Sequence, residues 1–578
     1  MMQALSDIRS TRLALLIPLV VAAAIYLPST ASRAVIDYDE GYYSQAAQQM
    51  IVRGDWVTPY ANGVRFLEKG PLMYWVTAAS MRLFGVNEFA LRLPTALAVI
   101  ALVLLVTLMA RRAAGAGAAI AAGLCIACST GTYLFTREAL HDIWLVLFVA
   151  LAMYAFFNWY LDSRHSLHHA LLFYAALAGS VLTKSLVGLA FPVGIVAIFF
   201  LIARARPRWR DLHLAPGLLL FFVLAVPWHV LAAIRNPGFL WAFFVNEQFL
   251  RFIGKHDPPV LWSMSLPMFW ALIPVWFFPW TAFLPAAFAA IRKPADPNQR
   301  SLVRLALIWT FVILGFFSIM GRLEHYVFPV LPALSLLVGI ALGRTGESRS
   351  VKWAFRGLAV FGVLILAAGI GAGIWFLTAG RGFENLSSTR SDFVAQTDYS
   401  ILADMPVAIM RELCKPAGVT IVALAAGFLL AAAFERRHAR LHAIMSMAAA
   451  MMIVCAMTHW SLVICEDLIS SKKFALAVSH EAQPGDHLVV IGDYESANSL
   501  NFYEPLRVEV AHGIAYALIP GMKFQDAPKI VLMDREFENL WKSNGRVFAL
   551  VPADQMAGLK LGGTRMLAVL DRVLIRNR

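Results

Sequence analysis

The sequence predicts an all-α polytopic membrane domain with about 13 transmembrane helices, followed by a small C-terminal α/β domain. Of the 578 residues, 60% are hydrophobic and only 15% are charged, and the mean hydropathy is +0.67. Soluble proteins average about half apolar and about a quarter charged residues. Long apolar runs recur up to residue 466, whereas residues 467–578 alone have the composition of a soluble domain. The composition therefore excludes a soluble globular protein.

The first apolar run, Leu13–Pro28, follows a short polar and basic segment. It lacks a convincing small-residue cleavage site, so we expect a retained first helix rather than a removed signal peptide. Apolar runs of about 17 to 25 residues are long enough to span a bilayer. The predicted spans lie near 13–30, 92–110, 114–135, 143–161, 168–183, 186–203, 214–234, 266–289, 303–320, 326–342, 354–378, 417–434 and 442–464.

Basic residues cluster in alternate loops between these runs, for example at Arg111-Arg112, 204–210 and Arg436-Arg437. Loops rich in lysine and arginine stay in the cytoplasm, so we expect a cytoplasmic N-terminus and a C-terminus on the outer face. The same distribution accounts for the net charge of +13, and we therefore expect no nucleic-acid partner.

This topology places four segments on the outer face, namely the first loop 31–91, the loops 235–265 and 379–416, and residues 467–578. In the last of these, short β-rich runs at 487–493, 529–534, 546–551 and 566–575 alternate with turn residues. Such a pattern indicates a small α/β domain. We therefore expect a transmembrane domain over 1–466 and an outer domain over 467–578.

The first loop contains an apolar pattern at helical spacing that Gly54 ends. It predicts an amphipathic helix along the outer membrane surface, with Tyr43, Ala46, Ala47 and Met50 on its apolar face. An acidic pair, Asp39-Glu40, stands at its start. Asp37 or Asp39 could simply cap this helix, which is the alternative to a functional role for the pair.

The predicted outer face also gathers acids and bases from distant parts of the chain. They are Asp37, Asp39, Glu40, Tyr43, Glu68 and Lys69, then Arg137, Glu138, His141 and Asp142, then Lys184, Glu247, Arg251 and His256, and finally Arg322, Glu324, His325 and Tyr326. A transporter would place such groups near the bilayer midplane. Their position at one interface favours a reaction between membrane-anchored substrates with polar heads.

The residue types indicate the kind of head group. Lys69, Lys184, Arg251 and Arg322 are residues that bind phosphate, although each taken singly could equally contact phospholipid head groups. Carboxylates beside them suit sugar hydroxyls, an amine or a proton transfer. Together they predict a sugar donor linked to polyprenyl phosphate.

Six motifs in order carry a family resemblance: DEGYY, GDWVTPY, FLEKGPLMYW, an HD pair before the fourth helix, LTKSLVGLAFP and HYVFPVLPAL. Over about residues 30 to 340 the chain resembles the C-type membrane glycosyltransferases. Within these it is most similar to the bacterial aminoarabinose transferases, which are related to the protein O-mannosyltransferases. It departs from them in having FLEKG where FEKP is commoner and DEGYY where DExRY is usual.

The resemblance implies an integral membrane enzyme that transfers 4-amino-4-deoxy-L-arabinose from undecaprenyl phosphate to phosphate groups of lipid A. The reaction would take place on the periplasmic face of a Gram-negative inner membrane and give resistance to polymyxin and other cationic antimicrobial peptides. The alternatives are a polyprenyl-phosphate-dependent protein O-mannosyltransferase-like or other sugar transferase, and a lipid-sugar flippase.

The expected site follows from the same motifs. Asp39, Glu40 and Asp142 are the expected catalytic carboxylates. The residues expected to hold the donor phosphate or the substrate are Lys69, Tyr43, Lys184, Arg251 and Tyr326. No cofactor is required, although Glu68 with His256 or His141 could bind a divalent metal such as zinc, since carboxylate and imidazole are zinc ligands.

Overall fold

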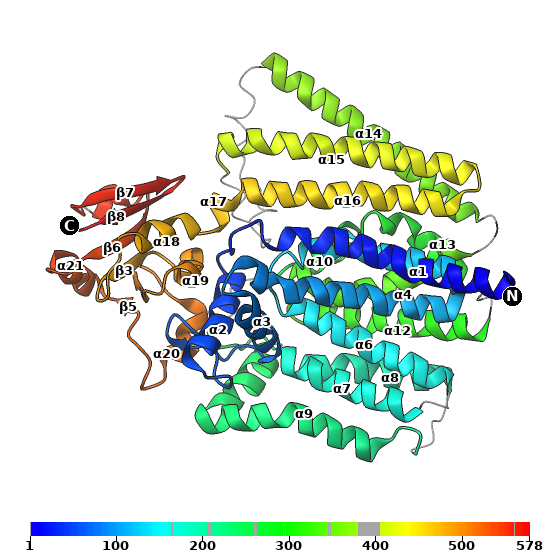
Figure 1. Ribbon diagram of the computed structural model, residues 1–578, viewed down its shortest axis with the longest axis horizontal. Helices are drawn as coiled ribbons and strands as arrows, with labels where there is room; N and C mark the ends of the chain where they lie inside the picture. The colour runs from blue at the N-terminus through cyan, green and yellow to red at the C-terminus, as the bar shows by residue number, and fades with distance from the viewer. Residues whose placement is uncertain are drawn as a thin grey trace.

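Long helices form a bundle, and a sheet-containing domain lies at one end of it (Figure 1). The computed structural model describes residues 2–162, 166–204, 210–251, 253–258, 263–292, 294, 296–344, 346, 348–379, 405–559 and 561–578. Most of the predicted outer loop 379–416 and part of the basic segment 204–210 fall outside these residues. The N-terminus lies at the end of the bundle opposite the C-terminal domain (Figure 1), as an odd number of spans requires.

Among the described residues, eleven helices are long and apolar enough to span a membrane, or twelve if one bent pair counts as a span. The bent pair consists of α10 (Leu266–Trp276) and the segment Trp280–Ile291, which contains η4 (Trp280–Phe283) and α11 (Leu284–Ile291), at an angle of 93°. The eleven are α1 (Met2–Tyr26), α4 (Glu88–Ala127), α6 (Asp142–Leu161), α7 (Ser166–Lys184), α8 (Leu186–Ala203), α9 (Leu214–Arg235), α12 (Pro297–Ile319), η5 (Glu324–Val330) with α13 (Leu331–Gly343), α14 (Arg349–Ala379), α15 (Val407–Arg436) and α16 (Arg440–Ile464).

The 40-residue helix α4 accounts for two of the predicted spans, 92–110 and 114–135. Its backbone leaves the helical region at Gly115, where φ is 80° and ψ is −172°, a conformation that glycine adopts readily. The two halves then lie side by side, because a Cβ atom at Gly123 would lie 2.3 Å from the Thr107 hydroxyl oxygen. With these halves counted separately and the bent pair counted once, the described residues contain the predicted thirteen spans.

Small residues allow the central helices to approach closely. A Cβ atom at Gly339 or Gly343 of α13 would lie within 2.5 Å of Ala122 or Ala118 of α4, respectively. Glycine and alanine at such contacts let helix backbones pack tightly where lipid offers no hydrophobic driving force. The alanine- and glycine-rich segment after Gly115 therefore lies in the middle of the bundle.

The first loop forms α2 (Asp39–Arg53), the hairpin of β1 (Tyr60–Ala61) and β2 (Val64–Arg65), and α3 (Leu72–Phe84). The predicted amphipathic helix is α2, which ends at a left-handed Gly54, and its apolar face is buried as expected. However, protein rather than lipid covers that face. The helix packs against α3 and against α19 (Leu500–Tyr503) of the outer domain, and a Cβ atom at Gly41 would lie 2.0 Å from the Asn498 amide oxygen.

The C-terminal domain has one six-stranded sheet of order β5-β4-β3-β6-β8-β7. Strands β3 (His487–Ile491), β4 (Val508–Ala511), β5 (Val531–Leu532) and β6 (Val547–Pro552) pair in parallel, and β7 (Thr564–Val569) and β8 (Arg572–Arg576) are antiparallel. The run 566–575, taken as one strand in the sequence, is split into two by a turn. The helices of the C-terminal domain are α17 (Glu466–Ile469), α18 (Lys472–Ser479), α19, α20 (Ile519–Met522), α21 (Asp534–Lys542) and α22 (Met556–Leu559).

Alternate residues of the central strands face opposite sides of this sheet, as strand geometry requires. Leu488 and Val490 belong to the hydrophobic cluster that continues into the helical bundle, whereas Val489 and Ile491 pack against Phe537 of α21 and its neighbours. The outer domain thus shares its core with the first loop and the bundle, and it is fixed over the end of the bundle where the first loop lies (Figure 1).

We expect the C-terminal domain to lie outside the inner membrane, and thiol labelling tests this. Glu538 is exposed on α21, and Asn298 is exposed at the start of α12, beside Arg112 of a predicted cytoplasmic loop. In a Cys414→Ser background, which removes the exposed native thiol, Glu538→Cys should react with an impermeant reagent once the outer membrane is permeabilised. Asn298→Cys should react only after the inner membrane is breached. The reverse pattern would contradict the orientation.

Candidate active site

Three neighbouring carboxylates at the start of α2, those of Asp37, Asp39 and Glu40, lie in different environments. Tyr38 has a φ of 71°, which is uncommon for a residue with a side chain. The outer domain holds it there, because the Tyr38 amide donates to the Glu495 carbonyl at 3.0 Å and the Asn498 side chain donates to the Tyr38 carbonyl at 2.7 Å. As a result Asp37 is buried, whereas Asp39 is exposed as the first residue of the helix.

The Asp37 carboxylate faces the outer domain and does not cap α2. The N-cap residue is Tyr38, which makes no capping hydrogen bond from its side chain. The Asp37 carboxylate instead accepts hydrogen bonds from the Ser499 amide at 2.8 Å and the Ser471 hydroxyl at 2.9 Å. The capping explanation therefore does not apply to Asp37.

Glu40, predicted to be catalytic, has a structural role in the fold. Its carboxylate is fully buried and accepts two hydrogen bonds from Arg92, at 2.8 and 2.7 Å. The Ile36 and Ala139 amides donate to the same carboxylate at 2.9 and 3.1 Å. Arg92 also donates to the carbonyls of residues 33 and 34. These bonds occupy both oxygens of Glu40, so the prediction of a catalytic role is corrected.

The second charged segment of the first loop is held against the end of α7. The Gly70 amide donates to the Thr183 carbonyl at 3.3 Å, and a Cβ atom at Gly70 would lie 2.1 Å from the Leu182 carbonyl oxygen. Only glycine permits so close an approach. The FLEKG motif therefore brings Lys69 to the end of the helix that carries Lys184.

Lys69 belongs to a network of alternating charges built from two outer loops. It forms an ion pair with Glu68, and Glu68 also lies 3.8 Å from Arg251. Arg251 follows the helix η3 (Trp241–Leu250) and pairs with Glu247 at 2.8 Å. Glu247 in turn contacts His256 at 2.6 Å. Two cations and two carboxylates thus meet at the end of the bundle that carries the C-terminal domain.

The network shifts the pKa values of its members in the directions expected for ion pairs. Burial alone would raise the pKa of Glu247, but the hydrogen bond from His256 and the charges of Lys69 and Arg251 lower it to about 2. Burial alone would lower the pKa of Lys69, but Glu68 raises it. Both groups are therefore charged at neutral pH.

A second ion pair joins three membrane helices. Asp142, the first residue of α6, contacts Lys184, the last residue of α7, at 2.6 Å. His325 of η5 lies 4.0 Å from the same carboxylate, and the Lys184 ammonium lies 5.5 Å from the ring centroid of Tyr326. The predicted residues of the HD, LTKS and HYVF motifs thus come together.

Aromatic residues connect the two charged groups. The ring of His141 lies edge-on to the rings of Tyr43 and Tyr74, with distances between ring centroids of 4.6 and 4.9 Å, respectively. Burial and the charges of Asp39 and Glu68 all raise the pKa of the Tyr43 hydroxyl, so both carboxylates lie near that ring. Apart from Glu40, the structure brings the predicted carboxylates, cations and tyrosines to one region.

The predicted metal ligands do not form a metal site. Glu68 pairs with Lys69 and Arg251, and both ring nitrogens of His256 face oxygens, one from Glu247 and one from a backbone carbonyl. No group of three or more His, Cys, Asp or Glu side chains suited to a metal ion occurs in the described ranges. The residues present do not fit a zinc ion.

Arg322 and Glu247 have contacts that the sequence did not predict. Arg322, considered a phosphate binder, donates to the carbonyls of residues 264, 318 and 320, which gives it a structural role. Glu247 was noticed in the sequence but not assigned to the site, although it joins Arg251 to His256. Tyr516 of the outer domain is close enough to Arg251 and Glu247 for their charges to act on it. No sequence signal placed this distant tyrosine there.

The chain is similar to known membrane glycosyltransferases. A family model described as dolichyl-phosphate-mannose-protein mannosyltransferase matches residues 11–243. The chain is 30% identical over 361 residues to the undecaprenyl phosphate-alpha-4-amino-4-deoxy-L-arabinose arabinosyl transferase of Pseudomonas paraeruginosa, which covers 60% of this chain and 63% of the relative. The protein of the same name from Serratia proteamaculans is 30% identical over 332 residues, 55% of this chain and 57% of its own. The matched region is thus less than two thirds of these relatives.

A solved structure extends the likeness to nearly the whole chain. The crystal structure of ArnT from Cupriavidus metallidurans bound to undecaprenyl phosphate superposes with a TM-score of 0.80 at 25% identity, covering 97% of each chain. The crystal structure of the same protein in the apo state superposes with a TM-score of 0.79 at 26% identity. The resemblance predicted from the motifs is confirmed: the chain has the fold of an aminoarabinose-transferase-like C-type glycosyltransferase.

The adjacent carboxylates Asp39 and Glu40 should behave differently on substitution. Glu40→Gln leaves the Arg92 charge buried without its partner, and we expect a loss of about 3 kcal/mol or more in stability. Asp39→Asn changes an exposed residue at a helix N-terminus, where loss of the charge costs about 0.3–1 kcal/mol. Thermal unfolding of the purified variants in detergent measures both. Equal losses would show that Glu40 is not a structural residue.

Proposed function

We propose that the chain transfers 4-amino-4-deoxy-L-arabinose from undecaprenyl phosphate to phosphate groups of lipid A. The modification would mask negative charge on lipid A and so weaken the binding of polymyxin and other cationic peptides. The names of the curated relatives and the carrier lipid in the similar crystal structure support the donor. The observation that carries the proposal is the meeting of Lys69, Arg251 and Lys184 with Asp39 and Asp142 at one end of the bundle.

The reaction exchanges one phosphate for another at the anomeric carbon of the sugar. The bond from that carbon to the carrier phosphate oxygen breaks, and a bond to a lipid A phosphate oxygen forms. The acceptor phosphate is already ionised at neutral pH, so it needs little help from a general base. The main requirement is stabilisation of the departing undecaprenyl phosphate, which positioned cations provide.

Lys69 and Arg251 are the residues we assign to the donor phosphate. Both lie next to Glu68 and Glu247, so the phosphate would replace a carboxylate as their partner. Arginine offers a planar fork for phosphate oxygens, and lysine acts as a point charge. Lys184 is the third cation near this position.

The carboxylates and tyrosines would orient the sugar. Asp39 is exposed at the start of α2, close enough to Tyr43 to raise the pKa of its hydroxyl. We assign Asp39 to the reacting centre, where it acts as a base or holds the sugar. Asp142, fixed by Lys184, and Tyr326, beside Lys184, would complete the wall of the site.

No nucleotide and no metal enter this scheme. The sugar arrives activated by its phosphate link to the carrier, and the sequence has no Rossmann-type glycine pattern in its cytoplasmic loops. We place the reaction on the periplasmic side of a Gram-negative inner membrane. The alternation of basic loops along the chain supports this orientation.

A second candidate function is the transfer of a sugar from a polyprenyl phosphate to a protein. The match of residues 11–243 to the protein mannosyltransferase family favours it. The chemistry at the donor would be the same, and only the acceptor would differ. A lipid-sugar flippase would use the same donor without forming a new covalent bond.

Mass spectrometry of lipid A tests the acceptor. In proteoliposomes with lipid A and the undecaprenyl-phosphate-linked sugar, the wild-type chain should add aminoarabinose to lipid A. Asp39→Asn should abolish the addition while the protein stays folded, because the carboxylate charge is lost at the reacting centre. Sugar found only on protein would favour the second candidate. Unmodified lipid A after incubation with the wild-type chain would contradict the proposed function. Full activity of Asp39→Asn would contradict the role of Asp39.

Substitution of Lys69 tests the donor phosphate site. Loss of a charge-assisted hydrogen bond in a partly desolvated site costs about 1.5–3 kcal/mol, so Lys69→Ala should reduce transfer roughly tenfold to hundredfold. Lys69→Arg should recover part of it, since the charge remains but the geometry changes.

Lys255 is the matched control, because it is an exposed cation of the neighbouring outer loop without an assigned role. Lys255→Ala should change transfer by less than about fivefold, as expected for a surface charge near lipid head groups. Equal, mild losses at the two lysines would mean that the donor phosphate binds elsewhere.

A further inference from the structure

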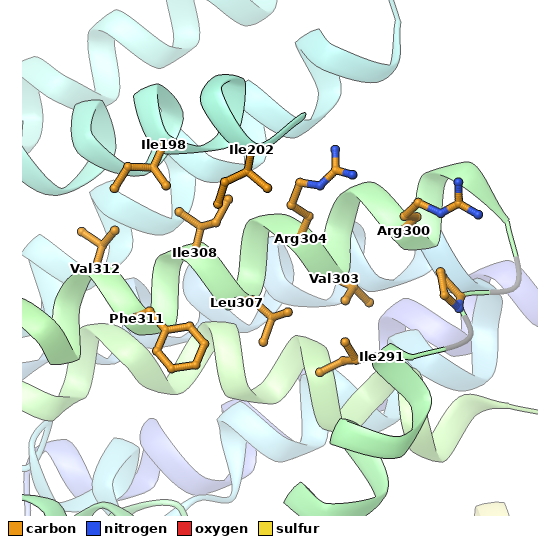
Figure 2. Close-up of a pocket in the computed structure, with 11 residues that line it drawn as sticks. Ile198, Ile202, Ile291, Arg300, Val303, Arg304, Leu307, Ile308, Phe311 and Val312 are labelled. Carbon is orange, nitrogen blue, oxygen red and sulfur yellow. The ribbon is translucent and has the colours of Figure 1, made fainter. Parts of the chain in front are cut away.

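A groove of about 560 Å³ lies far from the charged site, between α8, α11 and α12. Figure 2 shows Ile198 and Ile202 of α8 facing Ile308 of α12 across it. Its lining is largely aliphatic and aromatic, and it opens sideways, because Ile202 and Phe311 are 57% and 61% exposed. A sideways opening on a membrane-spanning helix faces lipid.

Two arginines mark one end of the groove. Arg300 and Arg304 lie one turn apart on α12, and both belong to the lining (Figure 2). Arg304 is held 5.8 Å from the ring centroid of the buried Phe199. Within the described ranges, no carboxylate lies within ion-pair distance of either guanidinium, unlike Arg251 or Arg92. Among the described residues, the groove therefore presents two positive charges that no carboxylate neutralises.

The depth of the groove matches one leaflet of a bilayer. Helix α12 starts at Pro297, so Arg300 and Arg304 lie in its first turns. At a rise of about 1.5 Å per residue, the lining from Arg300 to Val312 extends about 18 Å along the helix. The hydrocarbon core is about 30 Å thick, so the groove runs from the head-group level to about the middle of the membrane.

We propose that this groove binds an anionic phospholipid of the cytoplasmic leaflet. Arg300 and Arg304 hold the phosphate, and the acyl chains lie along the aliphatic wall formed by α8 and α12. Basic pockets between membrane helices on the cytoplasmic side are suited to anionic head groups. The inference rests on the proposed orientation of the chain, not on the sugar acceptor.

Two features distinguish this site from a surface where arginines merely extend to the interface. Snorkelling needs no concave apolar wall, whereas here the cations stand at the end of a groove of ligand size. The groove also ends near the middle of the membrane, which suits acyl chains. The much longer chain of a polyprenyl phosphate would leave most of its length outside.

Native mass spectrometry of the purified full chain in detergent tests the proposal. The probes are phosphatidylglycerol, the zwitterionic phosphatidylcholine, and undecaprenyl phosphate. We expect wild type to retain phosphatidylglycerol over phosphatidylcholine. Arg300→Gln with Arg304→Gln should weaken phosphatidylglycerol binding roughly tenfold or more, since charge-assisted hydrogen bonds to phosphate are lost.

The matched control is Arg349→Gln with Arg356→Gln on α14. Arg349 and Arg356 lie in the first turns of another helix, and both are exposed. This pair should leave phosphatidylglycerol binding unchanged. Ile202→Trp is a second variant that fills the groove from its exposed side, and it should weaken binding without removing any charge.

Equal retention of phosphatidylglycerol and phosphatidylcholine, or equal losses in the two double variants, would overturn the site and indicate ordinary boundary lipid. If undecaprenyl phosphate occupied the groove at a lower concentration than phosphatidylglycerol does, the assigned occupant would be wrong. Because sugar transfer is not the readout, these outcomes are independent of the proposed function.

Discussion

One buried carboxylate, Asp37, joins the first loop to the outer domain, and the arrangement of the site depends on it. It accepts hydrogen bonds from Ser499 and Ser471 and lies 3.7 Å from Arg572, while its amide donates to the Ile469 carbonyl at 2.8 Å. Burial raises the pKa of Asp37 to about 6, so the carboxylate would be costly to bury without these partners. With this residue fixed, the strained turn at Tyr38 directs Asp39 outward and Glu40 into the bundle.

The cations of the site are already paired with carboxylates before any substrate binds, so a phosphate must displace a carboxylate in order to bind. Lys69 and Arg251 each already have a carboxylate partner, and buried cations without partners would be unfavourable. An incoming phosphate therefore competes with Glu68 and Glu247. Burial alone would lower the pKa of His256, but its hydrogen bond to Glu247 raises it. Protonation of His256 would offset the charge of Glu247 and leave Arg251 free to turn to phosphate.

The spans, the basic loops and the motif residues could be predicted from the sequence because each depends on local composition and spacing. Asp142, Lys184 and Tyr326 met as expected, since each stands at the outer end of a predicted span. The role of Glu40 could not be predicted, because it depends on Arg92, which is distant in sequence. The burial of α2 depends on a domain more than 400 residues away. The break in α4 was predicted at 111–113 but lies at Gly115, because the alanine-rich surroundings of this glycine continue the helical pattern.

The central claim is that the donor phosphate binds between Lys69 and Arg251. A structure of the purified chain with undecaprenyl phosphate, determined by electron cryomicroscopy in nanodiscs, tests it most directly. The account predicts phosphate density within about 2.7–3.2 Å of the Lys69 ammonium and the Arg251 guanidinium, with Glu68 or Glu247 displaced from at least one of them. Phosphate density outside this pair, with both ion pairs intact, would contradict the account.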